Sequence, residues 1–392
     1  MQNFQIQTPT NLIFGKGTQH QIGALLKPHA KKVLLHYGGG TVKKLGLYDD
    51  TKKSLIVAGV DFVELGGVVP NPRLSLVYEG IELCKKEGVD YILAIGGGSA
   101  IDSAKAIALG MCYDGDVWDF YSDKAQAKQA LPVATILTIP AAGSEMSVSS
   151  VITNEKEGRK HGYSSDLIRP TISIVNPEYF TNLPAAQLGY GVSDIISHIF
   201  ERYFTNTKNC DITDGLCEAI LKTVMKNALI AREDPTNYDA WSEIGLGGIL
   251  AHNNWLGIGR VQDWASHGME HELSAYNDIA HGAGLAVLTP AWMKYVYKEN
   301  INMFVQFAVN VMGVEGSFRD PDAIVLEAIA RLEEFYKKLG LKLSLSELDI
   351  PESAFEEMAK KATGEFFGKE TGIGNFKRLM WQDVVEIFKL CK

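Results

Sequence analysis

The chain has 392 residues, 46% of them hydrophobic and 22% charged, and a formal net charge of −9, so it is long enough for two domains with a large core. The negative charge argues against non-specific nucleic-acid binding. No apolar run approaches the length of a membrane span. The N-terminus lacks the charged and apolar segments of a signal peptide. Five cysteines form no C-x-x-C pair, so we expect reduced thiols in a cytoplasmic protein.

The first glycine turn follows a predicted strand at 33–37. Gly38, Gly39 and Gly40 make the turn, and a helix is expected to begin near Thr41. In dinucleotide-binding folds such a turn often meets the adenine ribose, where an acidic residue favours NAD. This turn has no acidic residue, and two lysines follow Thr41, although lysines there are also typical of a solvated helix face. We therefore expect these four residues to bind NADP(H) preferentially, with NAD(H) also accepted.

A second glycine turn follows a buried strand pattern at 91–95. Gly96, Gly97, Gly98 and Ser99 lead into an Ala- and Ile-rich helix pattern over 100–109. Glycines let backbone N–H groups approach an anion, and the positive end of the helix favours a phosphate. The turn does not match G-x-G-x-x-G and could be an ordinary tight turn, but we favour a pyrophosphate site.

The chain changes character near residue 185, and Pro184 marks the expected boundary. Before it, strand patterns alternate with helices and glycine turns, which is typical of a largely parallel α/β sheet covered on both faces: VLLHY, YILAI, VATILTI and TISIVN. After it, long amphipathic patterns predict helices only. We expect an α/β dinucleotide-binding domain at 1–184, an all-helical metal-binding domain at 185–392, and a cleft that brings cofactor and metal together.

One aspartate and three histidines of the second half form a candidate metal site. Asp194 and His198 are four residues apart in a helical pattern, so their side chains share one face. His267 and His281 close the set, which suits zinc or ferrous iron. A single pair of this kind is usually solvated or hydrogen-bonded, but five of the nine histidines fall within 198–281. His252 fits no ligand spacing, so we interpret it as structural.

A competing metal motif overlaps this stretch. The sequence HGMEH reads as H-x-x-E-H, in which His267 and His271 would bind zinc and Glu270 would be the base of a peptidase. This interpretation leaves Asp194, His198 and His281 without a role, and Glu270 has no role outside it. A dinucleotide-binding half would also be out of place in a peptidase.

Taken together, these motifs resemble the iron-containing (group III) alcohol dehydrogenases, in particular the branch of butanol dehydrogenases and NADPH-dependent aldehyde reductases. The resemblance covers nearly the whole chain. It is carried by these segments: NLIFGKG, YGGGTVKK, PNP at 70–72, GGGSAIDSAKA, TIPAAGSEMS, the lysine at 160, NPEYFTNLP, DIISH and HGMEHELSAYNDIAHGAGLA.

The resemblance implies a dehydroquinate synthase-like architecture, in which the four metal ligands are Asp194, His198, His267 and His281. His271 matches a histidine near the nicotinamide and substrate. The implied cofactor contacts comprise Asn71, Gly97, Gly98, Ser99, Asp102, Thr138, Ser147 and Lys160. Family members often carry threonines around 138–144, where this chain has Ala141 and Ala142, which affects the fine contacts to the phosphates. Such proteins often form homodimers.

The implied activity is interconversion of small primary alcohols and aldehydes, such as butanol and butyraldehyde. One ion, Fe²⁺ or Zn²⁺, would act as a Lewis acid on the substrate oxygen, and the nicotinamide would exchange the hydride. His271 would relay a proton or orient the site.

The alternative to a dehydrogenase is a lyase of the dehydroquinate synthase type. It needs several basic residues, whereas the ligand region is apolar and aromatic, as shown by Trp255, Leu256, Trp264, Tyr276 and Trp292. We therefore favour a weakly polar substrate.

Overall fold

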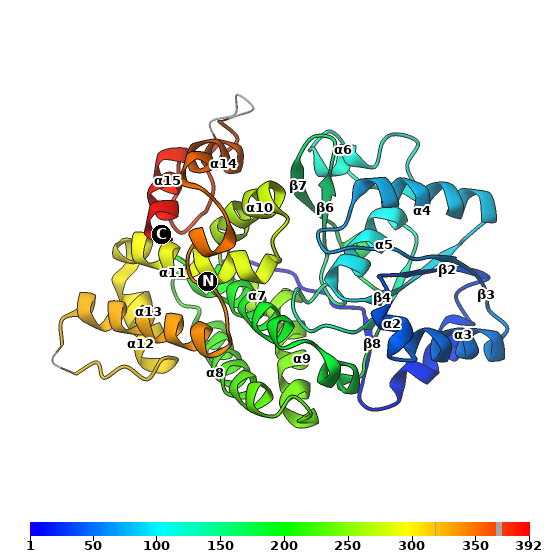
Figure 1. The fold of residues 1–392 in the computed structure, drawn as a ribbon, viewed down its shortest axis with the longest axis horizontal. Coiled ribbons are helices and arrows are strands. Elements are labelled where there is room, and N and C mark those ends of the chain that lie inside the picture. The colour runs from blue at the N-terminus through cyan, green and yellow to red at the C-terminus, as the bar shows by residue number, and fades with distance from the viewer. Residues whose placement is uncertain (318, 366–370) are drawn as a thin grey trace. The chain divides into compact units, whose positions relative to one another are not determined.

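The computed structural model describes residues 1–317, 319–365 and 371–392, which form two units (Figure 1). The N-terminal unit is Gln7–Leu183, and the C-terminal unit is Pro184–Lys392 together with Met1–Ile6. The first six residues join the C-terminal unit because the terminal amine donates to the Lys208 carbonyl oxygen at 2.7 Å and the Gln2 N–H donates to that of Gly259 at 2.8 Å. The sequence boundary at residue 184 assigned these residues to the first domain.

A six-stranded parallel sheet with strand order β1-β8-β5-β4-β2-β3 forms the N-terminal unit. Its strands are β1 (Asn11–Phe14), β2 (Lys32–Tyr37), β3 (Asp61–Leu65), β4 (Tyr91–Gly96), β5 (Val133–Leu137) and β8 (Ile172–Val175). The antiparallel hairpin is β6 (Ser149–Asn154) and β7 (Arg159–Ser164). The sequence predicted β2, β4, β5 and β8, because strands buried on both faces read as apolar runs. It missed the edge strands β1 and β3 and the polar hairpin.

Helices cover both faces of this sheet, as the sequence predicted. They are α1 (Ile22–Leu26), α2 (Thr41–Lys44), α3 (Leu47–Ala58), α4 (Leu74–Glu87), α5 (Gly98–Met111) and α6 (Trp118–Tyr121). Figure 1 shows α4 and α5 on one side of the sheet and α2 and α3 on the other. The neighbouring strands β2 and β4 are therefore followed by helices on opposite faces, which makes their carboxyl ends a topological switch point.

The C-terminal unit is helical in the described residues, apart from an isolated β-bridge between Ile373 and Leu379, so the expected fold class is confirmed. Its helices are α7 (Ala185–Tyr203), α8 (Asp211–Glu233), α9 (Tyr238–His252), α10 (Ala265–Asn277), α11 (His281–Val296), α12 (Ile301–Asn310), α13 (Pro321–Lys338), α14 (Phe355–Ala362) and α15 (Trp381–Leu390). None of the described helices is long and apolar enough to cross a membrane.

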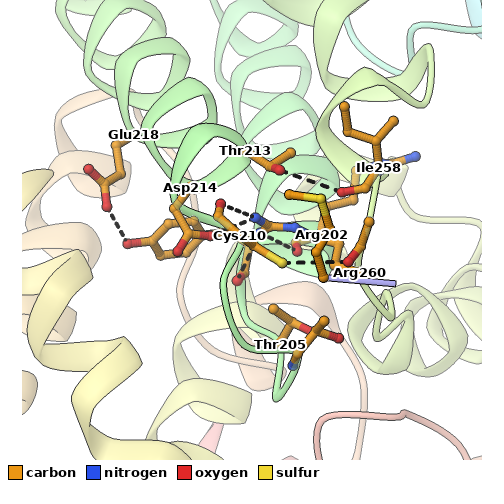
Figure 2. A network of polar contacts seen from close by, with 12 residues as sticks. Arg202, Thr205, Cys210, Thr213, Asp214, Glu218, Ile258 and Arg260 are labelled. Atoms are coloured by element: carbon orange, nitrogen blue, oxygen red, sulfur yellow. Dashed lines mark hydrogen bonds and ion pairs between the residues drawn. The ribbon is translucent and has the colours of Figure 1, made fainter. Parts of the chain in front are cut away.

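The end of α7 is fixed to the start of α8 by the buried side chain of Arg260 (Figure 2). Its guanidinium donates to the carbonyl oxygens of Arg202 and Cys210 at 3.1 Å, and it pairs with Asp214 at 2.6 Å. A cation suits this place because the last carbonyl groups of a helix carry partial negative charge. The contacts hold the C-terminal turn of α7 in place.

The central helix α7 is buried at every position from Gly191 to Tyr203. It approaches α11 so closely that a Cβ on Gly282 would lie 2.0 Å from the Tyr190 carbonyl oxygen. The Ser193 hydroxyl donates to the Gly282 carbonyl oxygen, and the Ser197 and Thr289 hydroxyls are 3.1 Å apart. These contacts fix the N-terminal half of α11 against α7.

We predict that Gly282→Ala destabilises the protein, because the added methyl group must separate α7 from α11 at a backbone contact. The expected loss is about 1–3 kcal/mol of unfolding free energy, typical of overpacking. Gly215→Ala is the matched control, since the same methyl group in α8 meets nothing within 4 Å. It should stabilise by about 0.5–1 kcal/mol. Thermal denaturation checks both, and an unchanged melting temperature for Gly282→Ala would contradict the packing argument.

Candidate functional site

The two glycine turns lie at one edge of the parallel sheet. The register pairs Tyr37 of β2 with Ile95 of β4, and Gly96 with Leu137 of β5, so the three strands end side by side. Gly38–Thr41, Gly96–Ser99 and Thr138 follow these strand ends, and the Thr138 N–H donates to the Gly96 carbonyl oxygen at 3.0 Å. Dinucleotides bind at such an edge, outside the carboxyl ends of strands at a switch point.

The turn after β4 has a backbone conformation suited to binding an anion. Gly96 has φ +155°, a value that favours glycine, and Gly97 is the N-cap of α5. No side chain of the described residues caps α5, so the N–H groups of its first turn can bind a phosphate. A Cβ on Gly98 would lie 3.2 Å from that of Ala142, so the segment with alanines in place of the family's threonines packs against this turn.

Three further expected cofactor residues are buried near the β6–β7 hairpin. Asn71 has φ +53° in a turn whose Pro72 carbonyl oxygen accepts from the Thr153 N–H at 2.8 Å. Thr153 pairs with Lys160 across the hairpin, so the structure brings Asn71 and Lys160 to neighbouring positions. Ser147 lies in the loop before β6, and its hydroxyl oxygen is 3.2 Å from the Lys105 ammonium.

Asp102 and Lys105 tie α5 to the segment 144–151, and the sequence interpretation missed Lys105. The Asp102 carboxylate accepts from the Ser144 hydroxyl and, at 2.9 Å, from the Val151 N–H. Lys105 donates to oxygen atoms of Ser144, Ser147 and Ser149 at 2.7–3.2 Å. Burial raises the pKa of Asp102 and lowers that of Lys105 to about 8, although their mutual attraction opposes both changes. The two side chains thus shape the loop that carries Ser147.

Asp194, His267 and His281 form a three-residue group with ligand atoms within 4.8 Å of one another. Asp194 Oδ1 lies 3.8 Å from His267 Nε2 and 3.9 Å from His281 Nε2. Two atoms that each bond to one ion at about 2.1 Å are at most about 4.2 Å apart, so these distances fit a shared ion. Asp194 Oδ1 and His267 Nε2 are buried without a hydrogen-bond partner among the described residues. Such atoms are costly unless something binds them, and a divalent ion fits.

His198 adjoins this group without being part of it. Its Nδ1 donates to the Asp194 carbonyl oxygen at 3.0 Å, and its ring centroid lies 4.4 Å from that of His267. The same Nδ1 is 2.9 Å from Asp194 Oδ1, but the carboxylate oxygen does not meet the geometry of a hydrogen bond. With Nδ1 engaged by the backbone, Nε2 is the nitrogen that His198 can present to an ion.

The H-x-x-E-H interpretation finds no support in the geometry. His271 is half-buried on α10 and outside the three-residue group, with its ring centroid 5.9 Å from that of His281. The Glu270 carboxylate is engaged by His281 Nδ1 and by the Ser274 hydroxyl. Glu270 thus contacts a candidate ligand, which the sequence interpretation did not anticipate. His271 lies next to the candidate ligand His281.

The electrostatics of the group favour a positive charge. Burial opposes ionisation of Asp194, but His198, His267 and His281 together hold the pKa of its carboxyl well below the usual value. Burial disfavours a charged His267 as well, yet the nearby carboxylates of Asp194 and Glu201 outweigh it and raise the pKa of His267 to about 9. Burial lowers the pKa of His198 to about 4. A bound metal ion would provide the positive charge beside Asp194 and Glu201 that a proton on His267 provides in its absence.

The expected aromatic surroundings of the ligands are only partly present. Trp264 lies at the group, with its ring centroid 5.2 Å from that of His267 and under the Arg202 guanidinium at 4.7 Å. Trp292 instead packs in the core against Phe204, Phe304 and Phe376, and the side chains of Tyr276 and Trp255 are exposed. Helix spacing alone did not distinguish these environments.

Sequence reasoning also missed Glu201, which bonds to His267 Nδ1 at 2.9 Å. A signal for it was available, because Asp194, His198 and Glu201 follow the spacing i, i+4, i+7 and share one face of α7. Glu270 likewise lies three residues after His267 on α10.

The chain is similar to known proteins over nearly its whole length. A family model described as "Iron-containing alcohol dehydrogenase" matches residues 9–177, and one described as "Fe-containing alcohol dehydrogenase family, C-terminal" matches residues 190–391. The chain is 42% identical over 390 residues to NADH-dependent butanol dehydrogenase A of Clostridium acetobutylicum, with 99% of each chain covered. It is 33% identical over 365 residues to NADPH-dependent aldehyde reductase YqhD of Escherichia coli, with 92% of this chain and 93% of the relative covered.

The fold is also similar to solved structures. The structure of NADH-dependent butanol dehydrogenase A from Thermotoga maritima matches with a TM-score of 0.96 and 41% identity, covering 100% of this chain and 99% of that one.

We predict that Asp194→Asn, His267→Ala and His281→Ala each lower the metal content of the purified protein. The loss of a ligand should weaken binding by more than the about 10–100-fold typical of residues that only orient a ligand. His29→Ala, an exposed histidine of the N-terminal unit, is the control. Elemental analysis after dialysis against a chelator measures the bound metal. Full occupancy in both histidine variants would show that the ion binds elsewhere.

Proposed function

The chain belongs to the iron-containing alcohol dehydrogenase family, and on that premise we propose that it interconverts small primary alcohols and aldehydes, such as butanol and butyraldehyde. It is an NAD(P)-linked oxidoreductase that uses one divalent metal, Fe²⁺ or Zn²⁺. The resemblance that the sequence motifs suggested is thus confirmed, and neither the lyase nor the peptidase alternative is favoured.

One observation carries the metal-dependent part of the proposal. Asp194 Oδ1 and His267 Nε2 are buried without a hydrogen-bond partner among the described residues, and His281 Nε2 faces the same carboxylate oxygen. In a purely structural network, buried polar atoms such as these would form hydrogen bonds with neighbouring residues. Metal-ligand atoms instead have lone pairs available to bind an ion. We propose that Asp194, His198, His267 and His281 hold the ion.

The bound ion would supply Lewis acidity to the substrate oxygen, and the nicotinamide would supply or accept the hydride. The chain's own residues perform the remaining tasks. The backbone of Gly97, Gly98 and Ser99 holds the pyrophosphate at the positive end of α5. His271, which lies beside the ligand set, passes a proton to or from the substrate oxygen or orients that oxygen.

Further cofactor contacts are proposed for the residues that the structure gathers around the strand ends and the β6–β7 hairpin. They are Gly38, Gly39, Gly40, Thr41, Asn71, Thr138, Ser147 and Lys160. Asp102 has both carboxylate oxygens engaged by Ser144 and Val151, so its contribution is to hold the loop that carries Ser147. We also propose that the protein acts in the cytoplasm as a homodimer; its unpaired cysteines support a reducing compartment.

We propose that the site accepts both nicotinamide cofactors and prefers NADP(H). The preference rests on the turn after β2, which has no carboxylate to repel a 2′-phosphate. Lys43 contributes little, because its ammonium lies over the Tyr48 ring at 4.8 Å and the Tyr37 ring at 5.5 Å. The names of the relatives include an NADH-dependent butanol dehydrogenase and an NADPH-dependent aldehyde reductase, so they are compatible with either cofactor.

The direct test of the proposed function is a steady-state assay of the metal-loaded protein. We predict oxidation of butanol and reduction of butyraldehyde, each dependent on the cofactor and abolished when a chelator removes the metal. Dehydroquinate synthase and peptidase assays of the same preparation are the comparison. Full turnover after verified metal removal, or activity in the lyase or peptidase assay alone, would contradict the proposal.

We predict that Gly39→Asp shifts the cofactor preference toward NAD(H), because the new carboxylate repels a 2′-phosphate and can bind a 2′-hydroxyl. A Cβ at this position meets nothing within 4 Å, so the substitution leaves the turn undisturbed. A charge-assisted hydrogen bond is worth roughly 1.5–3 kcal/mol, which corresponds to a change of about ten- to a hundredfold in the ratio of kcat/KM values. A ratio unmoved by the substitution would show that this turn does not set cofactor choice.

A further inference from the structure

Two candidate ligand histidines share one orientation. His267 and His281 each turn Nε2 toward Asp194 Oδ1, at 3.8 and 3.9 Å, and each turns Nδ1 toward a buried glutamate. Glu201 is the partner of His267, and Glu270 is the partner of His281. A neutral imidazole carries one proton, so an acceptor at Nδ1 leaves the lone pair on Nε2 for an ion.

Glu201 is held by three N–H donors. Its Oε1 accepts from His267 Nδ1 at 2.9 Å and from the His267 N–H at 3.0 Å. Its Oε2 accepts from the Trp264 N–H at 2.7 Å. Trp264 has φ +73°, which is uncommon for a bulky side chain, and it is the residue immediately before α10. Glu201 therefore orients the imidazole ring of His267. It also stabilises the strained backbone of Trp264, the residue that precedes α10.

Glu270 is completely buried on α10, and its side chain contacts α11. Its carboxylate accepts from His281 Nδ1 and from the Ser274 hydroxyl. Gly284, on the first turn of α11, makes room for it, because a Cβ there would lie 2.8 Å from Glu270 Cγ. The backbone of α11 is thus shaped to admit this side chain next to His281.

We propose that Glu201 and Glu270 are positioning residues of the metal centre, each of which holds one ligand histidine in the tautomer that presents Nε2 to the ion. This inference rests on the proposed function and extends it to two residues that do not touch the metal. Carboxylate–histidine–metal arrangements raise the basicity of the ligand and fix its ring, and the loss of the carboxylate typically weakens metal binding about 10–100-fold.

Glu218 provides a matched control for a merely structural effect of removing a buried carboxylate. It is a buried residue of α8 in the same unit, and Figure 2 shows its carboxylate in the network of polar contacts around Asp214. Its oxygens accept from the Tyr203 hydroxyl at 2.8 Å and from the amides of Gln306 and Asn310 at 2.8–3.1 Å. Its partners are neutral donors outside the candidate ligand set, so Glu218→Gln replaces a comparable buried carboxyl group without touching a ligand.

The experiment compares the affinity for Zn²⁺ of five proteins by competition with a chromophoric chelator: the parent, Glu201→Gln, Glu270→Gln, Glu270→Ala and Glu218→Gln. We expect an affinity about 10–100-fold lower for Glu201→Gln. For residue 270 the order should be Glu, then Gln, then Ala, because glutamine still accepts from His281 Nδ1 while alanine does not. Glu218→Gln should bind Zn²⁺ as the parent does, even if its melting temperature falls.

The visible spectrum of the Co²⁺-loaded proteins gives a second readout at the metal. Changes in the ligand-field bands are expected for the variants at 201 and 270 and not at 218. If affinities and spectra of these variants match the parent, or if Glu218→Gln changes them equally, the positioning role is wrong while the proposed function stands. A parent protein that binds neither Zn²⁺ nor Co²⁺ would overturn both.

Discussion

The structure depends on the compensation of buried negative charge around the ligand histidines. Asp194, Glu201 and Glu270 are all buried within the C-terminal unit. Each buried carboxylate is costly unless donors or a cation surround it. Glu201 and Glu270 are satisfied by backbone N–H groups, a hydroxyl and imidazole nitrogens, whereas Asp194 Oδ1 is left without a hydrogen bond. This uneven distribution of donors is what points to an ion at Asp194.

Several unfavourable features accompany these buried carboxylates: a buried polar helix, a close contact between helix backbones and two residues with positive φ. α7 is buried along its second half although it carries charged and polar residues, and Gly282 lets α11 meet it backbone to backbone. Trp264 adopts a positive φ where α10 begins, and Asp278 does so where α10 ends. Asp278 lies in the short link between α10 and α11, and the rings of His267 and His281 on these two helices have centroids 5.3 Å apart. Strain of this kind is typical of functional sites and is stabilised by the surrounding packing.

Sequence patterns predicted those features that are determined by residues close together in the chain. The central strands are continuous apolar runs, the glycine turns stand between strand and helix, and Asp194 and His198 have helical spacing. The partnership of His281 with Glu270 depends instead on the angle between α10 and α11, which spacing does not determine. The polar β6–β7 hairpin had no apolar alternation to identify it. Lys105 was missed because a lysine in a helix normally faces solvent, whereas here three serines enclose its ammonium.

The most direct test of the central claim is anomalous diffraction at the metal absorption edge from crystals of the iron- or zinc-loaded protein. The account predicts one ion within about 2.3 Å of Asp194 Oδ1 and of the Nε2 atoms of His198, His267 and His281, with Glu201 and Glu270 still on Nδ1 of their histidines. An anomalous peak between His267 and His271, or an ion bound through Nδ1 of either His267 or His281, would contradict it.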